Sequence, residues 1–184
     1  MSDSNFQVFA RVRPPTDPSS PSNYILTGEN YILLKQPYNK NIDKRESSYV
    51  FDGVFSEKLK NNEIFKKCVQ PNLQDLFLGI NVTFFAYGMT GSGKTHTVFG
   101  ARREEEGEKG LFNLAVEDIW NKMGDNKGNI TAKFSYLEIY NENVRDLLVE
   151  DQKSLNLVED PGKGNIFFNS FKFLIIHKGF KSQI

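Results

Sequence analysis

Eight consecutive residues have the types and spacing of a phosphate-binding loop. They are Gly88, Met89, Thr90, Gly91, Ser92, Gly93, Lys94 and Thr95. They fit the pattern G-x-x-x-x-G-K-[ST], whose glycines let the backbone curl until successive N–H groups point at an anion. In such a loop the lysine reaches the β- and γ-phosphates of a nucleotide and the final hydroxyl binds Mg²⁺. The motif predicts a nucleotide site with Thr95 as the magnesium ligand. The alternative interpretation is a glycine-rich turn with an exposed lysine.

Two flanking segments would hold this loop in place. The apolar, β-rich run Val82–Tyr87 predicts a strand that leads into it. The residues after Thr95 predict the start of a helix, whose N-terminal dipole would add to phosphate binding. A strand, a glycine-rich loop and a helix in this order are the context in which the motif binds phosphate.

Helices and strands are predicted on both sides of this unit. Apolar residues at helical spacing predict helices over 64–77 and 111–123. The first should be kinked or split at Pro71 and ended by Gly79, and the second should have Trp120 in the core. The charged stretch 102–109 predicts an exposed loop, and 143–148 one or two helical turns. Predicted strands cover 6–12, 24–26, 31–35, 49–51 and 130–140, of which 24–26 and 31–35 are expected to form a small hairpin. The proline- and serine-rich stretch 16–23 predicts a loop. This alternation predicts an α/β sheet with helices on both faces.

Composition narrows the class of protein. The chain has 184 residues, enough for one domain, and its 23 basic and 23 acidic residues balance, so a broad nucleic-acid-binding surface is not indicated. The single cysteine, Cys68, lies on an apolar stripe and is expected in the core rather than in catalysis. No apolar run approaches the length of a membrane span, and no signal peptide is visible, which favours a cytosolic location.

Four segments together resemble a known family. Phe9–Pro14 reads F-A-R-V-R-P, Phe51–Phe55 reads F-D-G-V-F, and the phosphate loop is preceded by F-A-Y and followed by H-T. Leu137–Leu148 reads L-E-I-Y-N-E-N-V-R-D-L-L. In order and spacing these segments are similar to those of kinesin motor domains. The resemblance implies an incomplete P-loop NTPase fold, a mixed central sheet flanked by helices, with residues 1–164 as the N-terminal part of a motor domain.

The resemblance also implies roles for individual residues. In kinesins the first arginine and the proline of R-x-R-P, here Arg11 and Pro14, flank the nucleotide base, and the residue after the loop threonine, here His96, lies against the base from the other side. A guanidinium, a proline ring and an imidazole suit a purine. The expected cofactors are ATP or ADP with Mg²⁺. The expected partner is the microtubule, and the expected location is the cytoplasmic cytoskeleton. For His96 an ordinary helical position stays open.

The chain also departs from the family. Neither N-x-x-S-S-R-S-H nor D-L-A-G-S-E, the two switch segments of kinesin motors, occurs in it. The resemblance implies a microtubule-dependent ATPase, but a chain without switches is expected to be inactive alone. Two functions therefore stay open: a microtubule motor whose recorded sequence is incomplete, and a non-motor fragment that binds nucleotide without hydrolysing it. The phosphate loop alone would also fit an unrelated small-molecule kinase, against which the other three segments argue.

The last twenty residues do not match the family. Residues 165–184 are rich in phenylalanine and isoleucine, and no acidic residue follows Asp160. They are interpreted as a wrongly ended gene model, a retained intron or an alternative truncated product. The alternatives are an amphipathic tail that binds a membrane or a partner, and a buried strand over 166–173. Since 171–176 combines apolar side chains with no acidic charge, poor solubility of the isolated chain is expected.

Overall fold

A computed structural model describes residues 6–15, 17, 25–35, 46–101, 107–124, 130–132, 134–150, 154–155, 157–160, 164–167, 176–177 and 180–181. The chain divides into two compact units, Met1–Pro71 with Phe84–Asp118, and Asn72–Thr83 with Ile119–Ile184. The phosphate loop belongs to the first unit. Most of the predicted loop over 16–23 and of the final segment 165–184 lies outside the described residues.

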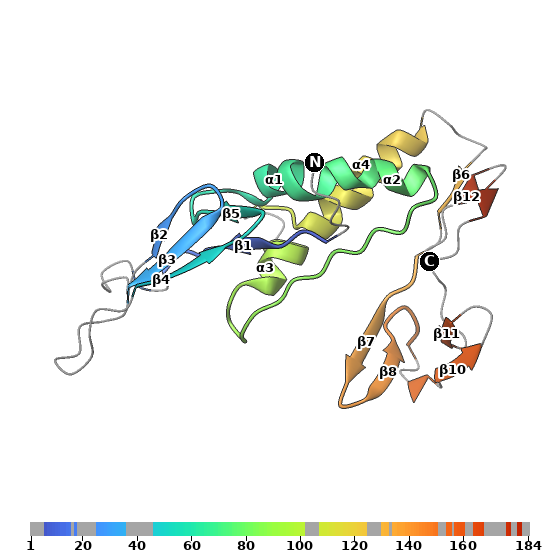
Figure 1. Cartoon of the computed structure of the whole chain (residues 1–184). Coiled ribbons are helices and arrows are strands. Elements are labelled where there is room, and N and C mark those ends of the chain that lie inside the picture. The colour runs from blue at the N-terminus through green and yellow to red at the C-terminus, as the bar shows by residue number, and fades with distance from the viewer. Residues whose placement is uncertain are drawn as a thin grey trace. The chain divides into compact units, whose positions relative to one another are not determined.

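Two small sheets form the strand part of the first unit (Figure 1). Strand β1 (Phe9–Arg11) pairs in parallel with β5 (Gly53–Phe55), and the rings of Phe9 and Phe55 stack with centroids 5.6 Å apart. Strands β2 (Ile25–Thr27), β3 (Tyr31–Lys35) and β4 (Glu46–Val50) form an antiparallel sheet. The predicted hairpin is confirmed over the described residues 25–35, whereas the strand predicted at 49–51 is longer and begins and ends earlier, as β4. β4 ends at Val50, because the chain turns there before β5 begins.

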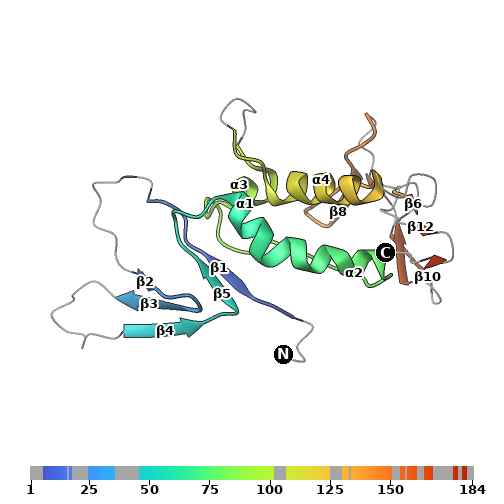
Figure 2. The same ribbon diagram turned by 90° about the horizontal axis from the view of Figure 1, so that it is seen from above.

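One continuous helical run follows the strands, and Figure 2 shows it as a single coil. It comprises α1 (Asn61–Ile64), a π-helical stretch (Phe65–Val69), a 3-10 turn (Gln70–Asn72) and α2 (Leu73–Phe77). The run is not split at Pro71, but its geometry changes there to a 3-10 turn, since proline has no N–H to continue the α-helical ladder. Gly79, at φ +82°, ends the run as expected. Cys68 is buried among the apolar residues of this run, as predicted.

The strand predicted over Val82–Tyr87 is absent. Within the described part of the chain this segment has no ladder partner, and Figure 1 draws it as a long green connection that leads to the loop. The side chains of Phe85 and Tyr87 are 71% and 94% exposed. The prediction was wrong because β-propensity describes how a residue suits a sheet, whereas a strand exists only where another strand pairs with it.

After the loop come α3 (Lys94–Phe99) and α4 (Leu111–Gly124), joined by a connection whose two ends pair with each other. Gly100 at one end and Lys109 at the other form an antiparallel bridge. A Cβ on Gly110 would lie 2.2 Å from the carbonyl oxygen of Val98, so the two chain segments meet only through glycine. Trp120, predicted in the core, is 68% exposed, because the buried face of α4 is centred on its neighbour Ile119. Among the described residues no helix is both long and apolar enough to cross a membrane.

The second unit contains short antiparallel pairs. Their bounds are β6 (Ile130–Thr131), β7 (Leu137–Tyr140), β8 (Asn143–Asp146), β9 (Ser154–Leu155), β10 (Leu157–Asp160), β11 (Gly164–Phe167), β12 (Ile176–His177) and β13 (Phe180–Lys181). The single strand predicted over 130–140 is two strands, since β6 pairs with β12 and β7 with β8. The helical turns predicted over 143–148 are instead strand β8. Asn141 and Glu142, at φ 48° and 63°, reverse the chain in a two-residue hairpin turn.

Candidate functional site

The predicted phosphate loop is a tight turn between the extended segment and α3. Its glycines Gly88, Gly91 and Gly93 have φ of +152°, +79° and +98°, and the last two lie in the left-handed region that side chains disfavour. The N–H of Ser92 donates to the carbonyl oxygen of Met89 at 3.1 Å, which closes the turn. Gly93 is the residue before helix α3. The glycine spacing therefore sets the backbone path by which the loop turns into the helix.

Lys94 is the first residue of α3, and its ammonium group folds back over the loop. Its Nζ donates to the carbonyl oxygens of Gly88 at 2.8 Å and Met89 at 2.9 Å. These are exposed contacts with neutral acceptors. An anionic phosphate would form stronger, charge-assisted bonds to the same ammonium. The lysine thus lies over the loop, where a phosphate would meet it.

The polar side chains of the loop are open to a ligand. Thr90, Ser92 and Thr95 are exposed, as is the apolar side chain of Met89. In the described part of the chain no three His, Cys, Asp or Glu side chains gather into a metal-binding group. A single threonine hydroxyl fits Mg²⁺ that is held chiefly by phosphate oxygens and water, which is how Mg²⁺ is usually bound with nucleotides. The donor set therefore suits a magnesium–nucleotide complex rather than a free metal ion.

Arg11 lies beneath the helix that follows the loop. Its Nη1 donates to Asn61 Oδ1 at 2.5 Å and Thr97 Oγ1 at 2.8 Å, and its Nη2 to the carbonyl oxygen of Leu59 at 3.4 Å. Burial lowers the pKa of Arg11, and the nearby carboxylate of Glu108 raises it. These bonds use the edges of the guanidinium, whereas a nucleotide base would stack on its face. The predicted base contact of Arg11 stays a prediction.

The other arginine of the same motif touches the loop directly. Arg13 donates through Nη1 to the carbonyl oxygen of Gly91. Pro14 is exposed beside it. From the sequence, Arg11 and Pro14 of R-x-R-P are assigned to the base and Arg13 is given no role. Strand periodicity does not point to it, since β1 ends at Arg11 and Arg13 lies beyond the strand.

His96 is the third residue of α3, and its side chain is half-exposed. Its Nε2 is 3.6 Å from Glu108 Oε2, and the two side chains are 49% and 29% exposed. The predicted base-flanking residue therefore has a carboxylate beside it. Glu108 was predicted to lie in an exposed loop, but the bridge at Gly100 brings it back against α3. Neither spacing nor residue type signals such a return.

One buried polar side chain joins these parts, and the sequence interpretation missed it. Asn61, at the start of α1, is 0% exposed. Its Nδ2 donates to the carbonyl oxygens of His96 and Lys109, each at 3.0 Å, and its backbone N–H donates to Glu108 Oε1. The only signal in the sequence is a polar residue three positions before the first apolar residue of a helix, which usually means a cap.

The sequence of this chain matches a known family. Residues 11–177 match the family described as the kinesin motor domain. The chain is 32% identical over 167 residues to the kinesin heavy chain of Neurospora crassa and 35% identical over 170 residues to that of Syncephalastrum racemosum. Each alignment covers 89% of this chain and 18% of the relative, so the chain spans about a fifth of their length.

A solved structure shows the same fold. A structure titled "Structure of a fast kinesin: Implications for ATPase mechanism and interactions with microtubules" matches with a TM-score of 0.77 and 28% identity. The match covers 91% of this chain and 48% of that one. The prediction of an incomplete α/β fold of the P-loop NTPase type is confirmed. The boundary predicted at residue 164 stays a prediction, although the family match runs past it.

Proposed function

The chain belongs to the kinesin motor domain family, and from that premise we propose that its loop Gly88–Thr95 binds ATP or ADP with Mg²⁺ for a microtubule motor. The observation that carries the proposal is the position of Lys94. Its ammonium lies over the left-handed glycine turn, where its present partners are two neutral carbonyl oxygens. A phosphate group in the turn would replace them with charged oxygens.

Each group of the loop has a distinct role in this proposal. The backbone N–H groups of the turn face the phosphates, and Lys94 neutralises their charge. The Thr95 hydroxyl holds Mg²⁺, which supplies further positive charge to the phosphate oxygens when it is bound. Arg11, Pro14 and His96 flank the base. Arg13 supports the loop through the carbonyl of Gly91.

The residues of this chain account for binding and positioning. Acceleration of phosphate transfer also needs groups that favour the transition state over the bound nucleotide. The two switch segments that carry such groups in kinesins do not occur among these 184 residues. We therefore propose nucleotide binding for these residues, and assign ATP hydrolysis coupled to movement along cytoplasmic microtubules to the whole motor.

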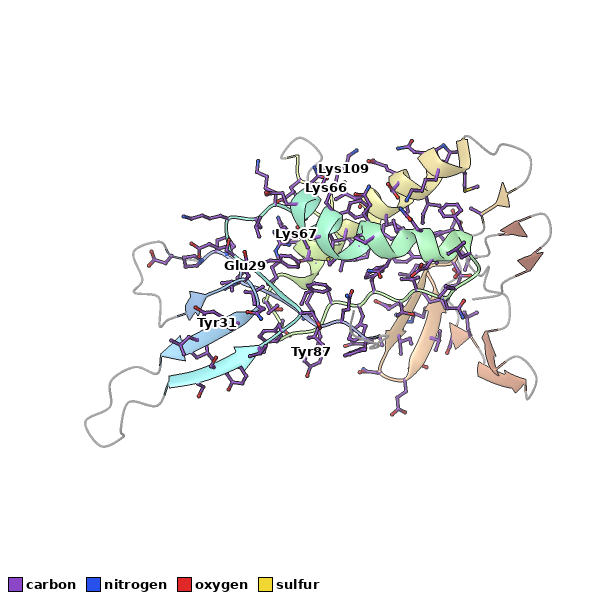
Figure 3. All side chains as sticks on the ribbon, turned by 45° about the horizontal axis from the view of Figure 1, so that its top comes forward. Glu29, Tyr31, Lys66, Lys67, Tyr87 and Lys109 are labelled. Carbon is purple, nitrogen blue, oxygen red and sulfur yellow. The ribbon has the colours of Figure 1, made fainter. Side chains whose placement is uncertain are left out.

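The test is the nucleotide affinity of Lys94→Ala. We expect the dissociation constant for MgADP, measured by isothermal titration calorimetry, to rise about ten- to a hundredfold, since a charge-assisted contact to phosphate is worth about 1.5–3 kcal/mol and tenfold is about 1.4. Lys67→Ala is the matched control, because Lys67 is an exposed lysine on the helical run (Figure 3). Its affinity should equal that of the unaltered chain. Unchanged binding by Lys94→Ala would show that the loop assignment is wrong.

A further inference from the structure

We propose that Asn61 is a positioning residue for the phosphate site, and that Glu108 holds Asn61 in place. The proposal rests on the nucleotide-binding function proposed for the loop. Neither residue touches the loop itself. Both act through helix α3, which carries Lys94 and Thr95 at its start.

The side chain of Asn61 forms hydrogen bonds to three separate segments of the chain. Nδ2 donates to a carbonyl oxygen in α3, that of His96, and to one before α4, that of Lys109, both at 3.0 Å. Oδ1 accepts from Arg11 on β1 at 2.5 Å. The residue is fully buried, so water cannot replace any of these bonds. An amide with both donor hydrogens and its acceptor engaged fixes three segments with one side chain.

A short chain of hydrogen bonds leads from Asn61 to the loop. Arg11 Nη1, bound to Asn61, also donates to Thr97 Oγ1 at 2.8 Å. Thr97 Oγ1 in turn donates to the carbonyl oxygen of Gly93 at 3.0 Å. Gly93 is the last glycine of the loop and directly precedes Lys94. The amide thus fixes the beginning of α3 through Arg11 and its middle through His96.

Glu108 completes the cluster with its carboxylate. One oxygen accepts the backbone N–H of Asn61, and the other lies 3.6 Å from His96 Nε2. Its negative charge raises the pKa of the half-buried Arg11, against the effect of burial. The carboxylate therefore compensates the guanidinium charge and fixes the backbone of Asn61 at the same time. Glu108 lies directly beyond Gly107, at the end of a stretch of the chain that is rich in glutamate.

A shift of α3 moves the groups that meet phosphate. If Asn61 acts through α3, its loss weakens every ligand with a diphosphate, including inorganic pyrophosphate, which has no base. If Asn61 acted only by holding Arg11 and His96, the residues proposed to flank the base, ADP binding would weaken and pyrophosphate binding would not. The two ligands therefore separate positioning of the helix from positioning of the base.

The experiment measures dissociation constants for MgADP and for magnesium pyrophosphate with the 184-residue chain and its variants. Asn61→Asp has the same size and keeps the acceptor for Arg11, but loses the Nδ2 donors. We expect it and Asn61→Ala to bind both ligands about tenfold more weakly, the size of one or two lost buried hydrogen bonds. Glu108→Gln keeps an oxygen for the Asn61 N–H and should stay within about threefold on the same scale.

Asp146→Ala is the matched control for general destabilisation. Asp146 is buried in β8 of the second unit, and its Oδ1 accepts the N–H of Leu148 at 2.9 Å. This variant should lower the melting temperature about as much as Asn61→Ala while leaving both dissociation constants unchanged. Equal weakening by Asp146→Ala would overturn the proposal, as would loss of ADP binding with pyrophosphate binding intact.

The same data separate this proposal from the proposed function. If Lys94→Ala loses both ligands while Asn61→Asp and Asn61→Ala bind them normally, the positioning role is wrong and the phosphate loop stands. If the unaltered chain binds neither ligand, the proposed function itself is wrong. Should Asn61→Ala fail to fold, Asn61→Asp and Glu108→Ala test the role, and normal binding by both would overturn it.

Discussion

The two segments that flank the phosphate loop are held very differently. The segment after the loop, α3, is bound to β1 through Arg11 and to α1 through Asn61. The bridge between Gly100 and Lys109 also ties its end to the residues before α4. The segment before the loop, residues 84–87, leads into it with no ladder partner among the described residues. Tyr87, labelled in Figure 3, is almost fully exposed there, whereas Asn61 is fully buried.

This contrast separates two ways in which a sequence can build a site. The α3 side is completed by polar contacts between segments that all lie within residues 9–110. The approach segment has the β-rich composition of a central strand, and a strand gains its stability from neighbours on both edges. The phosphate loop therefore has its glycine geometry although no strand pairs with the segment before it.

The largest effect should come from Gly100 on the α3 side. Its φ is +87°, and a Cβ would lie 2.2 Å from the carbonyl oxygen of Glu108. Gly100→Ala should lower the free energy of unfolding by about 3 kcal/mol, through a left-handed alanine and overpacking against backbone. Urea unfolding measures this. Gly124→Ala is the control, since Gly124 has open space around it and lies at the end of α4; it should change stability by less than about 1 kcal/mol.

The next effect tests the half-buried arginine. Arg11→Met keeps an unbranched apolar stem but leaves Asn61 Oδ1 and Thr97 Oγ1 without their donor, and should cost about 2–3 kcal/mol of unfolding free energy. Pro14→Ala, at an exposed position three residues on, should stay within about 0.5 kcal/mol. Equal stability of the two variants in urea would mean that the polar cluster does not hold α3.

The burial of Cys68, on the helical run that begins with Asn61, should make the unfolding free energy depend on pH. Burial raises the pKa of the Cys68 thiol from 9.0 to about 11, while a hydrogen bond from the backbone of Cys68 itself acts the other way. Above pH 9 the unfolded chain loses this proton and the folded chain keeps it, so stability is full below pH 9 and falls as pH rises towards 11. The loss is about 2–3 kcal/mol by pH 11, at about 1.4 kcal/mol for each pH unit.

Cys68→Ala is the reference for that measurement. Other groups also titrate at alkaline pH, so the quantity of interest is the difference between the unaltered chain and the variant. The difference in unfolding free energy should be constant below pH 9 and shrink between pH 9 and 11. A difference that stays constant over the whole range would show that the thiol is not buried in solution.

The smallest effect on stability should come from the approach segment. Tyr87→Ser removes a side chain that is 94% exposed and should change the unfolding free energy by less than about 0.5 kcal/mol. It should nevertheless raise the soluble fraction on expression, because an exposed apolar run without strand partners favours association. Phe55→Ser, at a buried position of β5, should instead lower both stability and solubility. If Tyr87→Ser were strongly destabilising, the segment would be covered in solution.

Several elements were predictable because their signals are local. The glycines of the loop, the disturbance of the helix at Pro71 and the hairpin over 25–35 depend on residues within a few positions of each other, and all three are present. The strand over 82–87 and the unbroken strand over 130–140 were wrong, since each depends on which distant segment pairs with it. The hairpin turn at Asn141 and Glu142 was missed because the segment after it suits a helix equally well.

The sequence by itself determined the family, the phosphate loop and its lysine, because spacing along one short segment is enough to define a curled backbone with a cation beside it. Only the tertiary structure decided how the site is supported. Asn61, Glu108 and Arg11 are far apart in the chain and have no motif in common, yet they meet under α3. A buried amide is satisfied only by partners that the fold brings to it, so its importance becomes visible once those partners are in place.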